Sequence, residues 1–124
     1  MVSPWASEEI VRCIEKVKRP NFKIWFDAAN IIFYTGKDSL EQLKPIVQYV
    51  TGFCARDCEK QNGNVWLEFG TGGVDFKAVF AELKGTGFNG PVMVEFCAQG
   101  ETAEIISANA RKNRDYLEQL FASL

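Results

Sequence analysis

The sequence contains no histidine among its 124 residues. Zinc sites built from cysteine and histidine pairs, or from the HExxH pattern, are therefore excluded. Cys54 and Cys58 are separated by three residues, so they do not form the C-x2-C pair of a cysteine zinc site either. With no export signal in the sequence, we expect the four cysteines to be reduced thiols rather than two disulfides. They are Cys13, Cys54, Cys58 and Cys97.

A surplus of positive charge and a long apolar run are also missing. Lys and Arg number 14 against 16 Asp and Glu, so we expect no binding to nucleic acid and none to an anionic membrane. No window approaches the roughly 20 apolar residues of a membrane helix, and MVSPWASEEIVRC lacks the basic and apolar regions of a signal peptide. We therefore expect a cytoplasmic protein with one domain over residues 1–124.

Helical and strand patterns alternate along the chain. This alternation predicts an α/β fold whose parallel strands are joined by right-handed crossovers. The strands are apolar without a period of two, which predicts that both faces of the sheet are covered. The predicted helices begin at Ser7, Ser39, Val74 and Thr102, and the predicted strands are 22–26, 49–55 and 91–96, with a possible short strand at 65–69.

Polar side chains follow the end of each predicted strand. Asp27 closes the first strand, Cys54 and Asp57 the second, and Glu95 the third. Because the carboxyl ends of parallel strands meet at one edge, we expect these groups to converge. Their carboxylates suit Mg²⁺ or Mn²⁺, or acid–base chemistry. The alternative is purely structural: Asp27 caps the following turn and Glu95 pairs with Arg56.

A glycine-rich segment, GTGG, precedes the third predicted helix. The backbone amides of Gly70, Gly72 and Gly73 could bind a phosphate there. No lysine follows in the P-loop pattern, and a simple turn explains the glycines equally well.

Three segments occur in a recognisable order: FDAANIIFYTGKD, then CARD, then EFGTGGVDFKAVFAELKGTGFNGPVMVEF. Together they resemble the sugar phosphate isomerase/epimerase family, the xylose-isomerase-like (β/α)8 barrels. In that family one strand ends in Asp, the next in H-x-K-D, a G-x-G-x-[VI]-D-[FY] loop opens a helix, and a last strand ends in Glu. The resemblance runs from about Ser7 onward and implies about half of a TIM barrel, with strands six to eight and their flanking helices.

The resemblance also implies roles for the residues at the strand ends. Asp27 and Glu95 match two metal-binding carboxylates of the family, and Asn30 lies beside the first. Glu95 further matches the glutamate that takes part in proton abstraction next to a carbonyl, so it is the expected catalytic residue.

At the second strand the sequence departs from the family. Cys54 stands where the family has its metal-binding histidine, and Arg56 and Asp57 stand where it has Lys-Asp, as an ion pair or as groups that support the site. A thiolate binds zinc well but suits Mg²⁺ or Mn²⁺ poorly. The expected cofactor is therefore Mn²⁺, Mg²⁺ or Zn²⁺, or none if Cys54 is only a small buried hydrophobe. Cys58 and Cys97 could add a cysteine cluster nearby.

A whole barrel of this kind needs about 250 residues and eight strands. A partial barrel exposes unpaired strand edges, so we expect a homo-oligomer or docking on a complementary half-barrel chain. Proton transfer also needs an acid and a base on opposite sides of the reacting carbon, and this chain alone supplies an incomplete set. Two functions stay open: a metal-dependent isomerase or epimerase of small sugars or sugar phosphates, inactive as an isolated chain, and a catalytically silent half-barrel acting as a structural fragment or small-molecule binder.

Overall fold

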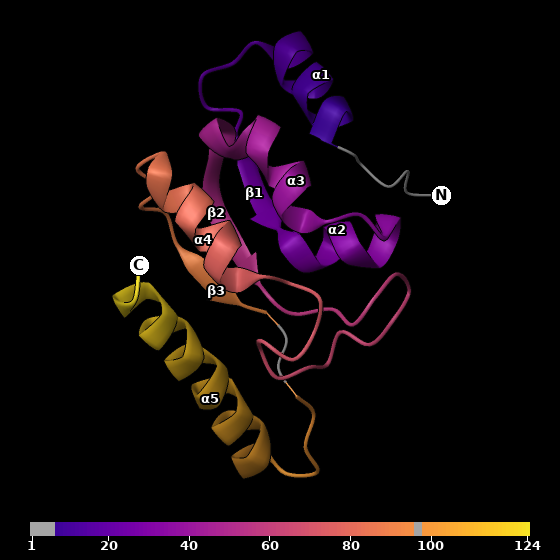
Figure 1. Ribbon diagram of the computed structural model, residues 1–124, viewed down its shortest axis with the longest axis vertical. Coiled ribbons are helices and arrows are strands. Elements are labelled where there is room, and N and C mark those ends of the chain that lie inside the picture. The colour runs from indigo at the N-terminus through magenta and orange to yellow at the C-terminus, as the bar shows by residue number, and fades with distance from the viewer. Residues whose placement is uncertain (1–6, 96–97) are drawn as a thin grey trace.

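The structure is a computed structural model that describes residues 7–95 and 98–124. Three parallel strands form one sheet in the order β1-β2-β3, which does not close on itself (Figure 1). The predicted α/β class and parallel strand order are therefore confirmed. The strands are β1 (Ile24–Asp27), β2 (Val50–Ala55) and β3 (Val92–Val94), and the helices are α1 (Ser7–Val17), α2 (Ala28–Thr35), α3 (Ser39–Leu43), the 3-10 helix η1 (Lys44–Tyr49), α4 (Phe76–Gly85) and α5 (Ala103–Ala122).

Helix α2 follows β1 directly, where the sequence analysis expected only a polar strand end. Asp27 caps it, because its Oδ1 accepts a hydrogen bond of 2.9 Å from the Asn30 amide. The helix ends at Gly36, whose φ of 68° places it in the left-handed region that glycine adopts readily. The predicted capping role of Asp27 is thus confirmed.

Two other segments differ from the expected elements. The helix predicted from Ser39 stops as an α-helix at Leu43 and continues as η1, since Pro45 has no amide hydrogen for the α-helical bond. Residues 65–69 form no strand. Their backbone is tied to α5 instead, because the Phe69 amide donates to the buried Asn113 side chain at 3.0 Å.

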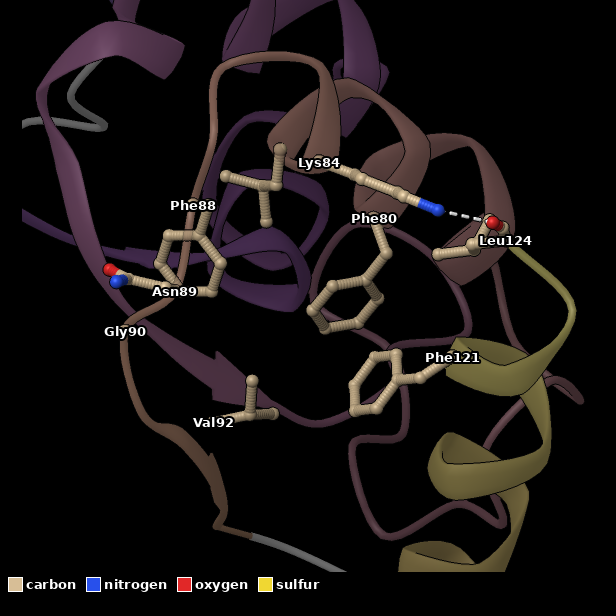
Figure 2. A pocket seen from close by; sticks show the side chains of 9 residues that line it. Phe80, Lys84, Phe88, Asn89, Gly90, Val92, Phe121 and Leu124 are labelled. Carbon is tan, nitrogen blue, oxygen red and sulfur yellow. Dashed lines mark hydrogen bonds between the residues drawn. The ribbon is translucent and has the colours of Figure 1, made fainter.

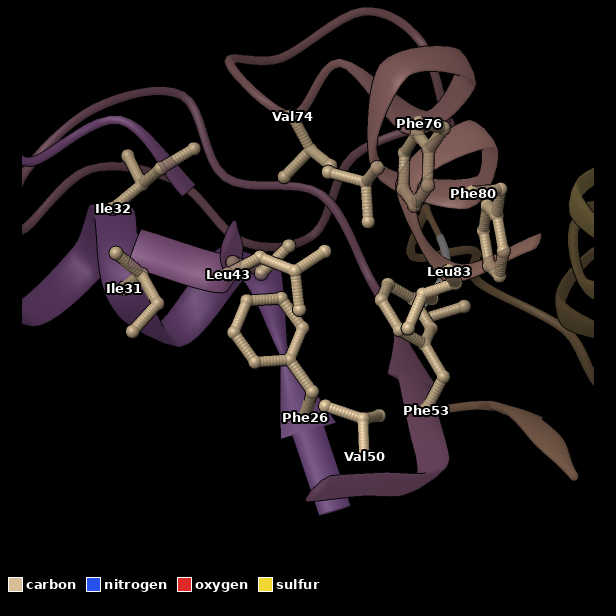
Figure 3. Packing of buried hydrophobic residues seen from close by; sticks show 14 of the residues in the cluster. Phe26, Ile31, Ile32, Leu43, Val50, Phe53, Val74, Phe76, Phe80 and Leu83 are labelled. Carbon is tan, nitrogen blue, oxygen red and sulfur yellow. The ribbon is translucent and has the colours of Figure 1, made fainter. Parts of the chain in front are cut away.

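The apolar core lies between one face of the sheet and the helices. Phe26 of β1 and Phe53 of β2 point into it and are 3% and 0% exposed (Figure 3). The Phe53 ring packs on Phe80 of α4 with centroids 4.6 Å apart. This face is the one that α2, α3 and α4 cover.

The opposite face of the sheet is open in the part of the chain that the structure describes. Trp25 of β1 is 54% exposed and Met93 of β3 is 48% exposed. The prediction that both faces are covered is therefore wrong for these residues. Their neighbours in the strands point the other way, into the core, as alternation along a strand requires.

Helix α5 packs on the core only through its C-terminal half. Leu117 is buried, and the Phe121 ring lies 4.7 Å from that of Phe80. Ile105 and Ile106, predicted to be on the buried side, are 45% and 47% exposed. Among the described residues no helix combines the length and apolar character that a membrane span requires.

Candidate functional site

Asp27, Cys54 and Glu95 lie together at the carboxyl end of the sheet. Asp27 pairs in register with Cys54, and the Glu95 amide donates to the Ala55 carbonyl at 3.1 Å, which continues the parallel pairing past β3. One oxygen of each carboxylate and the Cys54 sulfur all lie within 4.8 Å of one another. The structure thus brings together the three strand ends as the sequence predicted.

The Cys54 thiol is hydrogen-bonded to the Glu95 carboxylate. Its Sγ donates to Glu95 Oε2 at 2.6 Å, and Cys54 is only 5% exposed. Burial, then the hydrogen bond to Glu95 and the charges of Asp27 and Glu95, raise the pKa of Cys54 to about 12. The sulfur is therefore a protonated thiol at neutral pH, and it fixes the orientation of the Glu95 carboxylate, which is itself exposed.

Asp27 is held by a second set of partners. Its Oδ2 lies 2.9 Å from Arg56 Nε, and both side chains are about one-tenth exposed. Arg56 also donates through Nη2 to the side-chain oxygen of Asn30. Burial raises the pKa of Asp27, against the opposing effects of the Asn30 amide and of Arg56. Asn30 and Arg56 are thus placed beside the predicted ligand Asp27.

Asp57 does not face this cluster as the sequence suggested, but lies beneath the glycine-rich loop. It is 0% exposed and accepts four backbone hydrogen bonds. Oδ1 accepts from the amides of Cys58 at 2.8 Å and Val74 at 3.1 Å. Oδ2 accepts from the amides of Gly70 at 3.0 Å and Gly72 at 2.9 Å. This carboxylate holds the loop between β2 and α4 in place.

The backbone amides of the glycine-rich loop already donate to protein acceptors. The amides of Gly70 and Gly72 donate to Asp57, and that of Gly73 donates to the Cys58 carbonyl at 2.7 Å. A phosphate would have to displace these acceptors. The need for glycine has another cause: a Cβ at position 72 would lie 2.3 Å from Asp57 Oδ1, and Gly70 has a φ of 86°.

Cys58 does not join the cluster formed by Asp27, Cys54 and Glu95. Cys58 is buried, and its thiol donates to the Lys60 carbonyl at 3.2 Å. Cys97 lies outside the described residues, so the predicted cysteine cluster stays a prediction.

An apolar cavity of about 270 Å³ lies away from the strand ends (Figure 2). Phe80, Phe88 and Phe121 line it, and Lys84 closes one side by donating to the carbonyl oxygen of Leu124. Phe88 precedes β3, so this cavity is at the amino end of the sheet. It is no part of the cluster around Asp27.

The donor set of the cluster fits zinc better than magnesium. One thiolate and two carboxylates would leave a fourth tetrahedral position open, which is the pattern of catalytic zinc. A hard cation instead prefers oxygen ligands alone. Binding would require that Cys54 lose its proton and that Asp27 turn part of its carboxylate away from Arg56, since both Asp27 oxygens are engaged.

Cys54 is expected to make the protein lose stability at alkaline pH. Its pKa is about 12 in the folded chain against an ordinary 9.0. Between these values the unfolded chain has lost the proton that the folded chain keeps, so the free energy of unfolding falls as pH rises; below the lower value the group has no effect. Urea unfolding from about pH 8 to about pH 11 should show this fall in the free energy of unfolding. In Cys54→Ala the curve of this free energy against pH should be less steep, by the contribution of one bound proton.

The matched control for this prediction is Cys13→Ala. Cys13 lies in α1, outside the cluster, so this variant tests whether the loss of any thiol changes the slope. Parallel curves for the wild type and Cys54→Ala would contradict the assignment of the retained proton to Cys54.

Comparison with known proteins gives consistent matches. The sequence model of the xylose isomerase-like TIM barrel family matches residues 4–120. The L-ribulose-5-phosphate 3-epimerase UlaE of Salmonella paratyphi C is 30% identical over 107 residues, which are 86% of this chain and 36% of that protein. The chain therefore spans about a third of the length of this relative.

Solved structures agree with this match. A xylose isomerase domain protein from Planctomyces limnophilus superposes with a TM-score of 0.71 and 26% identity, over 98% of this chain and 44% of that one. A D-tagatose 3-epimerase-like protein gives a TM-score of 0.75 at 18% identity, over 94% and 41% of the two chains. The second likeness bears on the fold alone. The three strands and their helices thus correspond to part of a closed barrel.

Proposed function

Because the chain belongs to the xylose isomerase-like TIM barrel family, we propose that it forms part of a barrel that isomerises or epimerises a small sugar or sugar phosphate. The convergence of Asp27, Cys54 and Glu95 at the carboxyl end of the strands supports this most directly. In TIM barrels the chemistry takes place at that end. The name of the Salmonella relative, a ribulose-phosphate epimerase, favours a ketose phosphate as the substrate class.

Glu95 is the proposed base. It would take the proton from the carbon next to the substrate carbonyl, and the electrons of that C–H bond would move to the carbonyl oxygen and form an enediolate. Return of a proton to the other face of the same carbon inverts it. Return to the neighbouring carbon, together with transfer of the hydroxyl proton from one oxygen to the other, moves the carbonyl. In the chain without a bound ion, the Cys54 thiol positions Glu95 through the 2.6 Å hydrogen bond, and an ion held by both side chains would take the place of that bond.

Asp27, Cys54 and Glu95 would hold a divalent cation, with zinc as the proposed ion because of the thiol. When bound, the ion would stabilise negative charge on the substrate oxygen. Asn30 and Arg56 would keep Asp27 oriented, since both contact it or its helix cap in the structure.

The isolated chain is expected to be inactive. Inversion needs a second acid on the far side of the reacting carbon, and this chain covers only 36% of the epimerase that it matches. A second candidate function, the catalytically silent half-barrel, is favoured by one observation. Asp27 and Glu95 already have protein partners, Arg56 and Cys54, so neither needs a ligand to be satisfied.

A fused barrel tests the two functions. This chain would replace the matched region of the Salmonella relative, and exchange of the substrate C3 hydrogen with deuterated water would be followed by NMR on L-ribulose 5-phosphate with added Zn²⁺. Glu95→Gln should lower the exchange rate by about 10²- to 10⁴-fold because the base is lost. The exposed Glu101→Gln should not change it.

Exchange that survives Glu95→Gln at the original rate would sink the isomerase proposal. A fusion that melts cooperatively but exchanges nothing, with or without the substitution, would favour the silent half-barrel.

A further inference from the structure

Arg56 places a positive charge inside the candidate metal site. Its Nε lies 2.9 Å from Asp27 Oδ2, and its Nη2 donates to the side-chain oxygen of Asn30. The Arg56 side chain is 12% exposed and that of Asp27 is 10% exposed, so water and salt screen this ion pair much less than a surface pair. A metal ion that binds Asp27 therefore enters a site that already contains a cation.

The two oxygens of Asp27 differ in how easily their present partners can leave. Oδ1 accepts from the Asn30 amide, which is fixed in the first turn of α2. Oδ2 faces the end of the Arg56 side chain, which has many rotamers. Because a side chain can turn away and a helix amide cannot, an ion would take the oxygen that Arg56 now holds and leave the helix cap intact.

We propose that Arg56 competes with a divalent metal ion for Asp27 and so determines how tightly the site binds that ion. This inference rests on the metal site of the proposed function and adds a second determinant to it. The Cys54 thiol favours one kind of ion over another, whereas Arg56 lowers the affinity for each of them.

The charges that enter the site give the direction of the effect. Zn²⁺ brings two positive charges, and the Cys54 thiol gives up one proton to bind it, so one net positive charge enters beside Arg56. Mn²⁺ draws on the carboxylates and leaves the thiol its proton, so two positive charges enter. Like charges repel more strongly where water is largely excluded. Arg56 should therefore weaken the binding of both ions, and that of Mn²⁺ more.

Arg56 also helps to orient Asp27, and the loss of this contact would act in the opposite direction. That opposing effect is small, because Asp27 without Arg56 keeps its 2.9 Å hydrogen bond to the Asn30 amide. The pairing of β1 with β2 places Cys54 without any help from Arg56. Repulsion between Arg56 and the ion should consequently outweigh the loss of orientation.

The first test is competition between the protein and a chromophoric chelator for Zn²⁺ and for Mn²⁺ at neutral pH. Arg56→Gln should bind Zn²⁺ about 10- to 100-fold more tightly than the wild type, and its affinity for Mn²⁺ should rise further. Arg56→Lys keeps the charge and should stay near the wild type. Arg114→Gln removes the same charge from an exposed arginine of α5, which pairs with Asp115 at 2.8 Å, and should change neither affinity.

A measurement on the wild type covers the case in which Arg56→Gln fails to fold. The Arg56 Nε–H gives an NMR signal that can be assigned by its loss in Arg56→Lys. Without an ion, the contact with Asp27 Oδ2 should protect this hydrogen from exchange with water. Added Zn²⁺ should remove the protection, because Asp27 then turns to the ion.

The outcomes separate this inference from the proposed function. Equal affinities of the wild type and a folded Arg56→Gln, or an Arg56 signal that bound Zn²⁺ leaves unchanged, would overturn the inference and leave the metal site standing. Uptake by Arg56→Gln alone would support the inference, since Arg56 would then block the site completely. If neither protein takes up an ion, the proposed metal site is rejected and the inference with it.

Discussion

Replacing Asp57 with asparagine is expected to lower the free energy of unfolding by about 3–5 kcal/mol. The carboxylate is fully buried and accepts four backbone amides, two on each oxygen. Asparagine would keep one oxygen and turn an NH2 group, a donor, towards two amide donors. Such a loss is a large part of the roughly 5–15 kcal/mol that usually stabilises a domain.

Urea unfolding of the wild type and Asp57→Asn measures this loss. The matched control is Asp75→Asn, since Asp75 is also a loop aspartate but is exposed and caps α4 through one bond of 3.0 Å to the Ala78 amide. Asparagine caps helices about as well as aspartate, so the control should be nearly neutral. Equal effects of the two substitutions would show that the buried carboxylate does not hold the loop.

The role of Asp57 shows where sequence reasoning stops. Its place after a strand could be predicted, and so could the convergence of Asp27, Cys54 and Glu95, because parallel strands end at one edge. The loop that folds back over Asp57 contributes Gly72 and Val74, 15 and 17 residues further on. No local pattern encodes such a return, and the glycines predicted only a turn or a phosphate site at this place.

The apolar pattern of the strands predicted more burial than the structure of this chain shows. The apolar strands predicted two covered faces, and the helices cover one of them in the described residues. Trp25 and Met93 are suited to an interior, yet they lie in solvent. The same holds for Ile105 and Ile106, whose helical spacing predicted a buried side of α5. This chain covers 44% and 41% of the solved barrels that it matches, so the pattern fits the closed barrel rather than this part of it.

Helix α2 was missed for a different reason. Its sequence, AANIIFYT, is mostly apolar, with polar groups at Asn30, Tyr34 and Thr35, and includes β-branched residues, so it lacks the wide polar face that marks a helical period. The Asp27 cap and the left-handed Gly36 at its end are the local signals that fix it. Because the cap uses Asp27 Oδ1, the start of this helix also orients the candidate ligand.

Replacing Cys54 with serine is expected to lower the affinity of the chain for Zn²⁺ by about 100-fold or more, because the soft thiolate is the ligand that distinguishes this set from a site for hard cations. Serine keeps the size and the hydrogen bond to Glu95 but offers a hydroxyl that is a poor zinc ligand. Affinity for Mn²⁺, which draws on the carboxylates of Asp27 and Glu95, should change little.

Titration with Co²⁺ as a zinc substitute makes the ligand visible. A thiolate bound to cobalt gives a charge-transfer absorption in the near ultraviolet, and this band should appear in the wild type and in Cys13→Ser but not in Cys54→Ser. Asp27→Asn should weaken uptake while keeping the band, since the sulfur remains. If the wild type binds Mn²⁺ as tightly as Zn²⁺, or the band persists in Cys54→Ser, the thiol is no ligand and Cys54 is a buried hydrophobe at a position that lost its metal-binding role.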